Sequence, residues 1–174
     1  MNDIIGNGII LRNARLEDFG GICEMERLCF PPNEAEKPEN VLRRLRHAPA
    51  AFLVAEDAAR GALAGFVCGM PTDERSFRDE FFTDESLYDP HGENVIMLSL
   101  EVHPDYRGMG IARRLMEGFA SREAAAGRRA LILTCHEALI GMYEGLGFIH
   151  NGLANSCWGG ETWHEMRRAL DEES

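Results

Sequence analysis

Two glycines at a turn have the residue types and the spacing that bind phosphate. Gly108 and Gly110 lie between a strongly apolar segment, residues 95–102, and a segment with helical periodicity. A backbone without Cβ allows close approach of a diphosphate, and N–H groups that begin a helix lie at its positive dipole end. Three arginines concentrate positive charge here in a chain of net charge −11: Arg107, Arg113 and Arg114. The turn predicts a phosphate site, although a purely structural turn fits the same glycines.

Two other phosphate-binding motifs do not match this turn. The dinucleotide fingerprint needs a third glycine, and an acidic residue about 20 positions further on that binds a ribose; both features are missing. A P-loop needs Gly-Lys-Ser/Thr, and the single lysine of the chain is Lys37. The sequence therefore excludes these two classes of nucleotide site.

Apolar periodicity predicts the elements that position the turn. A second half in which strands and helices alternate indicates an α/β domain, and we expect one domain over residues 1–170 with a short acidic tail at 171–174. Strands are predicted at residues 8–14, 51–55, 63–69, 95–102, 130–135, 148–149 and 161–167, and helices at residues 16–30, from Pro38 to Pro49, from the turn to Gly127, and at 137–145.

An acidic segment with aromatic residues interrupts the predicted sheet. Residues 71–94 hold eight acidic residues against two arginines. We interpret the segment as a surface excursion with a short helix near residues 84–88. With residues 30–32 it either lines a site that attracts an ammonium group and packs an apolar body, or is a solvated mobile loop. Its aromatic residues are Phe77, Phe81, Phe82 and Tyr88.

Composition and charge exclude several functions. The net charge of −11 would repel a phosphate backbone, so we expect no nucleic acid partner. Five widely spaced cysteines argue against a disulfide framework and against a zinc site, and no metal is expected. No apolar run approaches the roughly 20 residues that span a bilayer, and no secretory signal is apparent. We expect a cytoplasmic monomer or homodimer without membrane attachment.

The turn and its surroundings resemble a known family. Residues 102–116 resemble the acetyl-CoA signature of GNAT N-acetyltransferases, Arg/Gln-x-x-Gly-x-Gly/Ala, in which Arg107, Gly110 and Ala112 fill the three defining positions. Residues 135–148 and 163–166 resemble the matching helix and last strand of arylalkylamine N-acetyltransferases, and residues 24–30 more weakly resemble their first helix. The resemblance implies an α/β GNAT fold whose central, mixed, mostly antiparallel, splayed sheet has about six to seven strands flanked by helices.

Acetyl-CoA is the co-substrate that this resemblance implies. In the family, the strand before the turn splays from its neighbour and pairs through its backbone with the pantetheine arm, while the turn holds the pyrophosphate. The implied cofactor-binding residues are Leu100, Val102, Arg107, Gly108, Met109, Gly110, Ile111 and Ala112.

The implied reaction is direct transfer of the acetyl group to a primary amine, without a covalent enzyme intermediate. Tyr143 matches the tyrosine that family members place near the CoA sulfur as a general acid; packing beneath the cofactor is its structural alternative. The vertebrate arylalkylamine enzymes carry two histidines where this chain has Ile96 and Leu98, so their proton relay is absent. The substitute bases that we consider are Glu26, Glu34 and Glu101, each of which could instead be solvated or salt-bridged.

The acceptor is the least defined part of the prediction. A small arylalkylamine or a polyamine is favoured as the amine partner. A protein or peptide amine acetyltransferase is one alternative, and a CoA-binding regulatory domain without catalysis is another.

Overall fold

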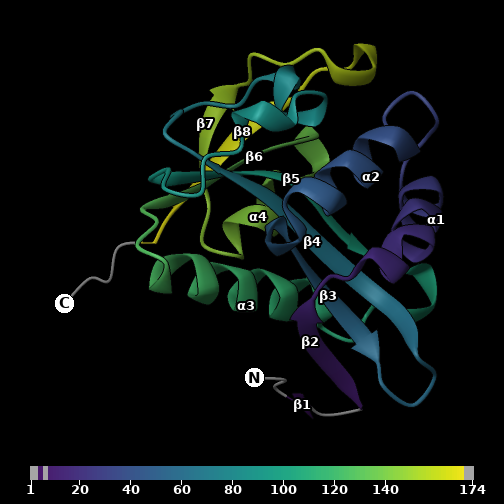
Figure 1. Ribbon diagram of the computed structural model, residues 1–174. Coiled ribbons are helices and arrows are strands. Elements are labelled where there is room, and N and C mark those ends of the chain that lie inside the picture. The colour runs from purple at the N-terminus through teal and green to yellow at the C-terminus, as the bar shows by residue number, and fades with distance from the viewer. Residues whose placement is uncertain (1–3, 6–7, 171–174) are drawn as a thin grey trace. The chain divides into compact units, whose positions relative to one another are not determined.

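The computed structural model describes residues 4–5 and 8–170, which form two compact units (Figure 1). Unit 1 comprises the described residues up to Cys68 together with Ser99–Phe119. Unit 2 comprises Gly69–Leu98 and the described residues from Ala120 onward. Three elements contribute to both units: β4 (Ala62–Thr72), β5 (Asn94–Val102) and α3 (Ile111–Ala125).

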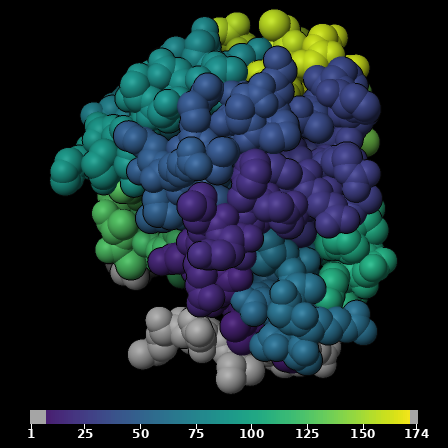
Figure 2. Space-filling model, turned by 45° about the vertical axis from the view of Figure 1, so that its right-hand side comes forward, coloured from purple at the N-terminus to yellow at the C-terminus, as the bar shows by residue number. Residues whose placement is uncertain are grey.

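Unit 1 is a sheet in the order β1-β2-β3-β4-β5, whose pairs β1–β2, β2–β3 and β3–β4 are antiparallel. Helices α1 and α2 form the purple and blue surface in Figure 2. Pro38 begins α2, where its missing N–H costs no hydrogen bond. The residue bounds of these elements are β1 (Ile4–Ile5), β2 (Ile9–Asn13), β3 (Phe52–Asp57), α1 (Phe19–Cys29) and α2 (Pro38–His47).

A β-bulge at Ala64 decides which helix each side of β4 meets. Ala55 pairs with Gly65 and Glu56 with Leu63, so Ala64 is the extra residue and the side-chain alternation reverses across it. Leu63 contacts Gly21 of α1, whereas Gly65 meets Ile111 and Leu115 of α3. The two helices therefore cover opposite faces of this part of the sheet.

The same bulge brings β4 close to β5. His103 donates its backbone N–H to the Ala64 carbonyl oxygen at 2.9 Å. A Cβ at Gly65 would lie 2.6 Å from the carbonyl oxygen of Glu101, so only glycine fits without a shift. This close approach fixes β5 at the residue that carries the candidate carboxylate.

Unit 2 continues the sheet in the order β4-β5-β6-β8-β7. Strands β5 and β6 are parallel, whereas β8 pairs antiparallel with both β6 and β7. The predicted mixed, mostly antiparallel sheet flanked by helices is confirmed, with eight strands among the described residues because the two-residue β1 is added. In unit 2, the residue bounds are β6 (Ala130–Cys135), β7 (Ile149–Leu153), β8 (His164–Ala169) and α4 (Ile140–Glu144).

Strands β5 and β6 separate soon after they begin. Among the described residues, their pairing covers Asn94–Ile96 and Ala130–Ile132, although β5 continues to Val102 and β6 to Cys135. Beyond these three pairs, β6 pairs only with β8 in the described part of the chain. The backbone of β5 after Ile96 is thus released from β6, as the expected splay requires.

The acidic segment between β4 and β5 is packed rather than solvated. Phe77 and Phe81 are buried in one cluster with Met70 of β4, Ile96 of β5 and Ile132 of β6. Burying such side chains stabilises the fold, so the reading of this segment as a mobile loop is wrong. The segment forms two short 3-10 turns, Asp79–Phe82 and Glu85–Leu87, the second of which lies where a short helix was expected.

Two further contacts hold this segment in place. The ring of Phe82 stacks on that of Trp158, with centroids 4.2 Å apart. A Cβ at Gly92 would lie within 2.4–2.5 Å of the Thr72 backbone, so the return to β5 needs glycine there. These contacts fasten the acidic segment to the turn at Trp158–Gly160 and to the end of β4.

The closing strand begins later than predicted. β8 starts at His164 rather than at residue 161, because a 3-10 turn at Trp158–Gly160 precedes it. Gly159 and Gly160 adopt φ of 65° and 77°, which extended strands do not allow. β7 runs on to Leu153, beyond the predicted residues 148–149. The expected tail at 171–174 lies outside the described residues.

Other 3-10 turns complete the chain. They lie at Leu16–Asp18, Pro49–Ala51, Pro104–Tyr106 and Glu137–Leu139. In the described part of the chain, every helix is too short or too polar to cross a membrane.

Candidate active site

The predicted phosphate turn has the local geometry that an anion needs. Gly108 and Gly110 adopt φ of 77° and 76°, a region that favours glycine, and the position of a Cβ on either has no other atom within 4 Å. Helix α3 begins at Ile111, directly after the second glycine. The first turn of a helix leaves backbone N–H groups without intrahelical acceptors. The cradle therefore fits the pyrophosphate of acetyl-CoA.

The loop before the glycines is fastened within unit 1. Tyr106 donates its hydroxyl hydrogen to Asp57 Oδ2 at 2.8 Å, which ties the loop to the β3–β4 hairpin. The imidazole Nδ1 of His103 accepts the backbone N–H of Asp105 at 3.1 Å. These contacts fix the position from which the exposed backbone of the turn begins.

Arg107 joins the turn to the end of α1. Its Nε donates to the Val102 carbonyl oxygen at 3.3 Å, and its Nη2 lies 3.6 Å from Cys29 Sγ. The Cys29 thiol also donates to that carbonyl at 3.6 Å. These two donors use both lone pairs of the Val102 carbonyl oxygen. A pantetheine arm beside β5 would therefore pair with other backbone groups of the strand.

The remaining predicted cofactor residues divide between backbone and core roles. Leu100 and Val102 are half-buried on β5, and Met109 is exposed at the tip of the turn. The side chain of Ile111 is buried against β4, so any contact it makes with a phosphate comes from its backbone. Ala112 is half-buried in the first turn of α3.

Two of the three candidate bases lie side by side inside unit 1. Glu26 of α1 is 4% exposed and Glu101 of β5 is 3% exposed. Ser99 lies on the same face of β5 as Glu101, as alternation predicted, and donates its hydroxyl hydrogen to Glu26 Oε1 at 3.2 Å. Glu26 precedes Cys29 by one helical turn, so α1 connects the carboxyl pair with Arg107 and the phosphate turn.

The environment of Glu101 favours its protonated form. Burial raises the pKa of the Glu101 carboxyl well above its usual value, and the neighbouring charge of Glu26 raises it further. Both carboxyl oxygens are buried and meet no hydrogen-bond donor among the described residues. A carboxylic acid in this position is neutral where ordinary glutamates are ionised.

The third candidate base lies outside this arrangement, and a different glutamate takes part. Glu34 is half-buried in the loop after α1, with its backbone N–H donating to the Pro31 carbonyl oxygen. Glu36 instead donates its backbone N–H to Glu26 Oε2 at 3.0 Å. Its carboxylate forms a buried two-point ion pair with Arg44 of α2, with Nη1 to Oε2 at 2.8 Å. Sequence reasoning did not find Glu36 or Arg44.

Tyr143 lies in unit 2, on the short helix α4. It is 8% exposed, and its ring meets Phe148 edge-on with centroids 5.7 Å apart. Its carbonyl oxygen accepts the backbone N–H groups of Leu146 and Phe148, at 2.9 and 3.1 Å. The packing is that of a well-fixed side chain, which suits both a general acid and a structural tyrosine.

The two residues at the positions of the family histidines are core residues of unit 2. Ile96 is fully buried in the core cluster of unit 2, against which Leu98 packs. Burial raises the pKa of the Cys135 thiol to about 11, which disfavours the thiolate that a nucleophilic cysteine needs. The described residues contain no cluster of His, Cys, Asp and Glu that could hold a metal ion.

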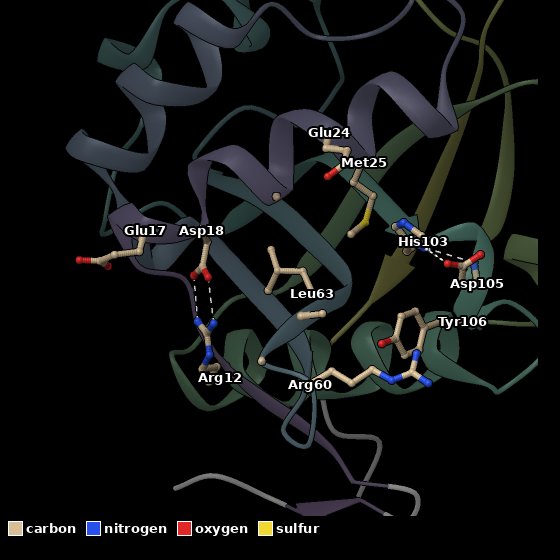
Figure 3. A pocket seen from close by; sticks show the side chains of 13 residues that line it. Arg12, Glu17, Asp18, Glu24, Met25, Arg60, Leu63, His103, Asp105 and Tyr106 are labelled. Carbon is tan, nitrogen blue, oxygen red and sulfur yellow. Dashed lines mark hydrogen bonds and ion pairs between the residues drawn. The ribbon is translucent and has the colours of Figure 1, made fainter.

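A groove in unit 1, with a volume of about 460 Å³, lies beside the loop at residues 103–106 (Figure 3). Two pairs of its charged groups interact: Arg12 binds Asp18, and the imidazole of His103 faces Asp105. Leu63 and Met25 contribute apolar surface. Neither member of the Glu26–Glu101 pair lines this groove, so it is separate from the candidate base.

Comparison with known proteins identifies the family. Residues 19–148 match the sequence model of the Acetyltransferase (GNAT) family. The chain is 32% identical over 142 residues to an acetyltransferase of Pectobacterium atrosepticum, covering 79% of this chain and 86% of that protein. It is 33% identical to an acetyltransferase of Yersinia pestis over the same shares of both chains.

Solved structures share the fold at low sequence identity. The loading GNATL domain of CurA from Lyngbya majuscula has a TM-score of 0.80 at 16% identity, covering 93% of this chain and 98% of that one. Two further solved structures hold acetyl-CoA. The putative acetyltransferase yncA of Salmonella typhimurium has a TM-score of 0.66 at 20% identity, covering 95% of this chain and 96% of that one. A phosphinothricin acetyltransferase of Sinorhizobium meliloti has a TM-score of 0.67 at 23% identity, covering 95% of this chain and 90% of that one. The chain belongs to the GNAT family of acetyltransferases.

Proposed function

We propose that this acetyltransferase transfers the acetyl group directly to a primary amine, with residues 1–170 acting as one domain. The observation that carries the proposal is the buried Glu26–Glu101 pair. Glu26 lies one helical turn before Cys29, which contacts Arg107. Amines are protonated near neutral pH, so attack on a thioester requires a base. A buried, negatively charged pair both attracts an ammonium group and accepts its proton.

Each group has a defined task in this scheme. The glycine turn and Arg107 hold the phosphates, and the released edge of β5 aligns the pantetheine arm. A carboxylate of the glutamate pair takes one proton from the acceptor ammonium. The neutral amine attacks the thioester carbonyl, the carbon–sulfur bond breaks, and Tyr143 donates its hydroxyl proton to the departing thiolate. The second proton of the amine nitrogen then restores the Tyr143 hydroxyl, which leaves a neutral amide and the free thiol. Acetyl-CoA supplies the activated acyl group.

The acceptor that we propose is a small arylalkylamine or a polyamine. Support comes from the resemblance of residues 135–148 to arylalkylamine N-acetyltransferases and from the negative charge of the glutamate pair. The aromatic rings of Phe77 and Phe81 do not contribute to a binding wall, because both are buried in the core of unit 2. The half-buried Phe82 and Tyr88 are the remaining aromatic candidates of the acidic segment.

Calorimetric titration of acetyl-CoA tests the cofactor site. Gly110→Trp introduces an indole at the open cradle and should abolish the micromolar binding expected of the unaltered chain. Gly127→Trp is the matched control, because Gly127 also has positive φ, also has open space around its Cβ position, and lies at the other end of α3. An equal loss of acetyl-CoA binding in both variants would mean that a tryptophan disrupts the fold wherever it is introduced. No acetyl-CoA binding by the unaltered chain would refute the proposed cofactor site.

Thiol release from acetyl-CoA across a panel of amines tests the reaction. Turnover is expected with arylalkylamines or polyamines and not with peptides that present an N-terminal amine or a lysine. Tyr143→Phe should lower turnover at least tenfold while acetyl-CoA affinity stays nearly unchanged. Unchanged turnover would assign Tyr143 a packing role, and cofactor binding without turnover on any amine would favour a regulatory domain.

A further inference from the structure

Three glutamates and one arginine are buried together in unit 1. Glu26, Glu36, Glu101 and Arg44 are each at most 6% exposed. They come from four different parts of the chain: α1, the loop after it, β5 and α2. A buried charge is costly unless it is paired or hydrogen-bonded, so the way in which these groups share donors indicates the charge of each.

The donors are distributed unequally among the three carboxyl groups. Glu36 receives the two-point ion pair from Arg44. Glu26 receives two hydrogen bonds, from the backbone N–H of Glu36 and from the hydroxyl of Ser99. Glu101 receives none from the described residues. Hydrogen bonds to the charged form stabilise it, so Glu36 and Glu26 have environments suited to carboxylates and Glu101 has not.

A single proton resolves this arrangement. Two like charges in one buried site disfavour double ionisation, so one member of the pair keeps a proton. A protonated Glu101 gains an O–H donor, and its neighbour Glu26 is an acceptor. The proton therefore belongs to the carboxyl without other donors, and the negative charge belongs to Glu26.

The other titratable groups around the pair do not change this balance. Cys29 and Cys23 of α1 and Cys68 of β4 lie near the glutamates; burial raises the pKa of the Cys23 thiol to about 11 and that of the Cys68 thiol to about 12. Arg43 of α2 also acts on Glu36, but its side chain is exposed and donates to Asn40. Burial raises the pKa of the Glu36 carboxyl, and the guanidinium of Arg44 opposes that rise.

We propose that the Glu36–Arg44 ion pair is a positioning device that holds Glu26 as the ionised member of a Glu26–Glu101 pair sharing one proton. Arg44 keeps Glu36 ionised and in place, which holds the Glu36 backbone N–H against Glu26. Glu26 is then the base of the pair, and Glu101 is the acid that stabilises its charge. The role of Glu26 as the base rests on the proposed amine acetylation and is tested by turnover. The charges assigned to Glu26 and Glu101 do not rest on that reaction.

Infrared spectroscopy with carboxyl-labelled glutamate tests the shared proton without turnover. The carbonyl stretch of a protonated carboxylic acid is well separated from that of a carboxylate. We expect one protonated glutamate to persist in the unaltered chain at a pH where ordinary glutamates are ionised, and to be lost in Glu101→Gln. Its absence from the unaltered chain, or its retention in Glu101→Gln, would overturn the proposal.

The arginine is tested by two substitutions and a control. In Arg44→Met, Glu36 loses its partner, so a second protonated glutamate should appear; in Arg44→Lys the charge remains and the spectrum should stay that of the unaltered chain. Arg12→Met is the matched control, because it breaks the ion pairs with Asp18 and Glu56 in the same unit without touching Glu26. The Glu56 side chain is 21% exposed against 3% for Glu36, so Glu56 should stay ionised without its partner. A second protonated signal in the control, or none in Arg44→Met, would refute the positioning role.

Ser99→Ala keeps the proposal testable if Arg44 variants do not fold. The substitution removes one donor to Glu26 and leaves no buried charge without its partner. Loss of a hydrogen bond to a charged group should move the acid limb of the kcat/KM–pH profile upward by roughly one pH unit, which is about a tenfold lower rate at a fixed acidic pH. A lower rate at every pH with an unmoved limb would contradict the assignment of Glu26. If no variant acetylates an amine but the infrared signals are as expected, the proposed reaction is wrong and the proposed charges of the glutamates stand.

Discussion

The buried carboxyl of Glu101 should make the protein less stable as the pH rises, and replacing it with an amide should remove that loss. Burial, and then the charge of Glu26, raises the folded-state pKa of Glu101 above the unfolded value of about 4.3. The folded chain therefore binds this proton more tightly than the unfolded chain. The resulting stability is fully present below the unfolded pKa and is lost as the pH rises through the folded pKa.

The magnitude follows from the missing donors. An unsatisfied buried polar group costs about 1–3 kcal/mol, and more when it is charged; each pKa unit of displacement corresponds to about 1.36 kcal/mol. Glu101→Gln stays neutral at every pH, and its NH₂ group can donate to Glu26 in place of the carboxylic O–H. We expect equal stability of the two proteins near pH 5, and an advantage of about 1–3 kcal/mol for the variant once the pH passes the folded pKa.

Urea unfolding at a series of pH values measures this difference. With an m-value of about 2 kcal/mol per molar urea, the midpoint of Glu101→Gln should exceed that of the unaltered protein by roughly 0.5–1.5 M at alkaline pH. Glu24→Gln is the control, because Glu24 lies on α1 but is 61% exposed, and its effect should stay within about 0.5 kcal/mol at all pH values. Parallel stability curves for the unaltered protein and Glu101→Gln would refute the reasoning.

Three further substitutions test the packing around the site. Gly92→Ala places a Cβ within 2.4–2.5 Å of the Thr72 backbone and should cost about 1–3 kcal/mol by thermal unfolding; an unchanged midpoint would contradict this close approach. Phe82→Leu and Trp158→Leu, combined in a double-mutant cycle, should show a coupling of about 0.5–1.5 kcal/mol, and additive effects would exclude the stacking contribution. Arg44→Met removes the partner of the buried Glu36 carboxyl, which must then take up a proton or remain unpaired, and should cost about 3–5 kcal/mol in urea unfolding; a loss below 1 kcal/mol would show that the pair contributes little.

The sequence was most informative where the chain signals its structure locally. The strand at Asn94–Val102, the two glycines at positive φ and the helix after them are consecutive, so periodicity and turn chemistry were sufficient to predict them. Pro38 likewise marks the start of α2. Element type depends on neighbouring residues in these cases, and the prediction needed no knowledge of tertiary contacts.

The parts that were missed depend on contacts between distant segments. Nothing in the sequence around Glu36 distinguishes it from Glu34, and its role comes from a loop that brings its backbone to Glu26 and its side chain to Arg44. The acidic segment looked solvated because charges surround its aromatic residues, yet Phe77 and Phe81 are buried by strands. A useful signal was available, since four aromatic residues within twelve positions exceed what a solvated loop needs.

The absent histidines and the buried carboxyls are connected by a single chemical requirement. A base for an ammonium group works best with a pKa near the operating pH, and histidine meets that requirement with an unperturbed pKa of about 6.5. A glutamate of ordinary pKa, about 4.3, is too weak a base. With Ile96 and Leu98 at the histidine positions, the base must be a carboxyl, and the pair that contains Glu101 is the one in which burial and then a neighbouring charge raise a pKa. The same burial that makes the pair chemically useful therefore costs stability, and an increase of stability with a loss of turnover in Glu101→Gln is the joint result that this account requires.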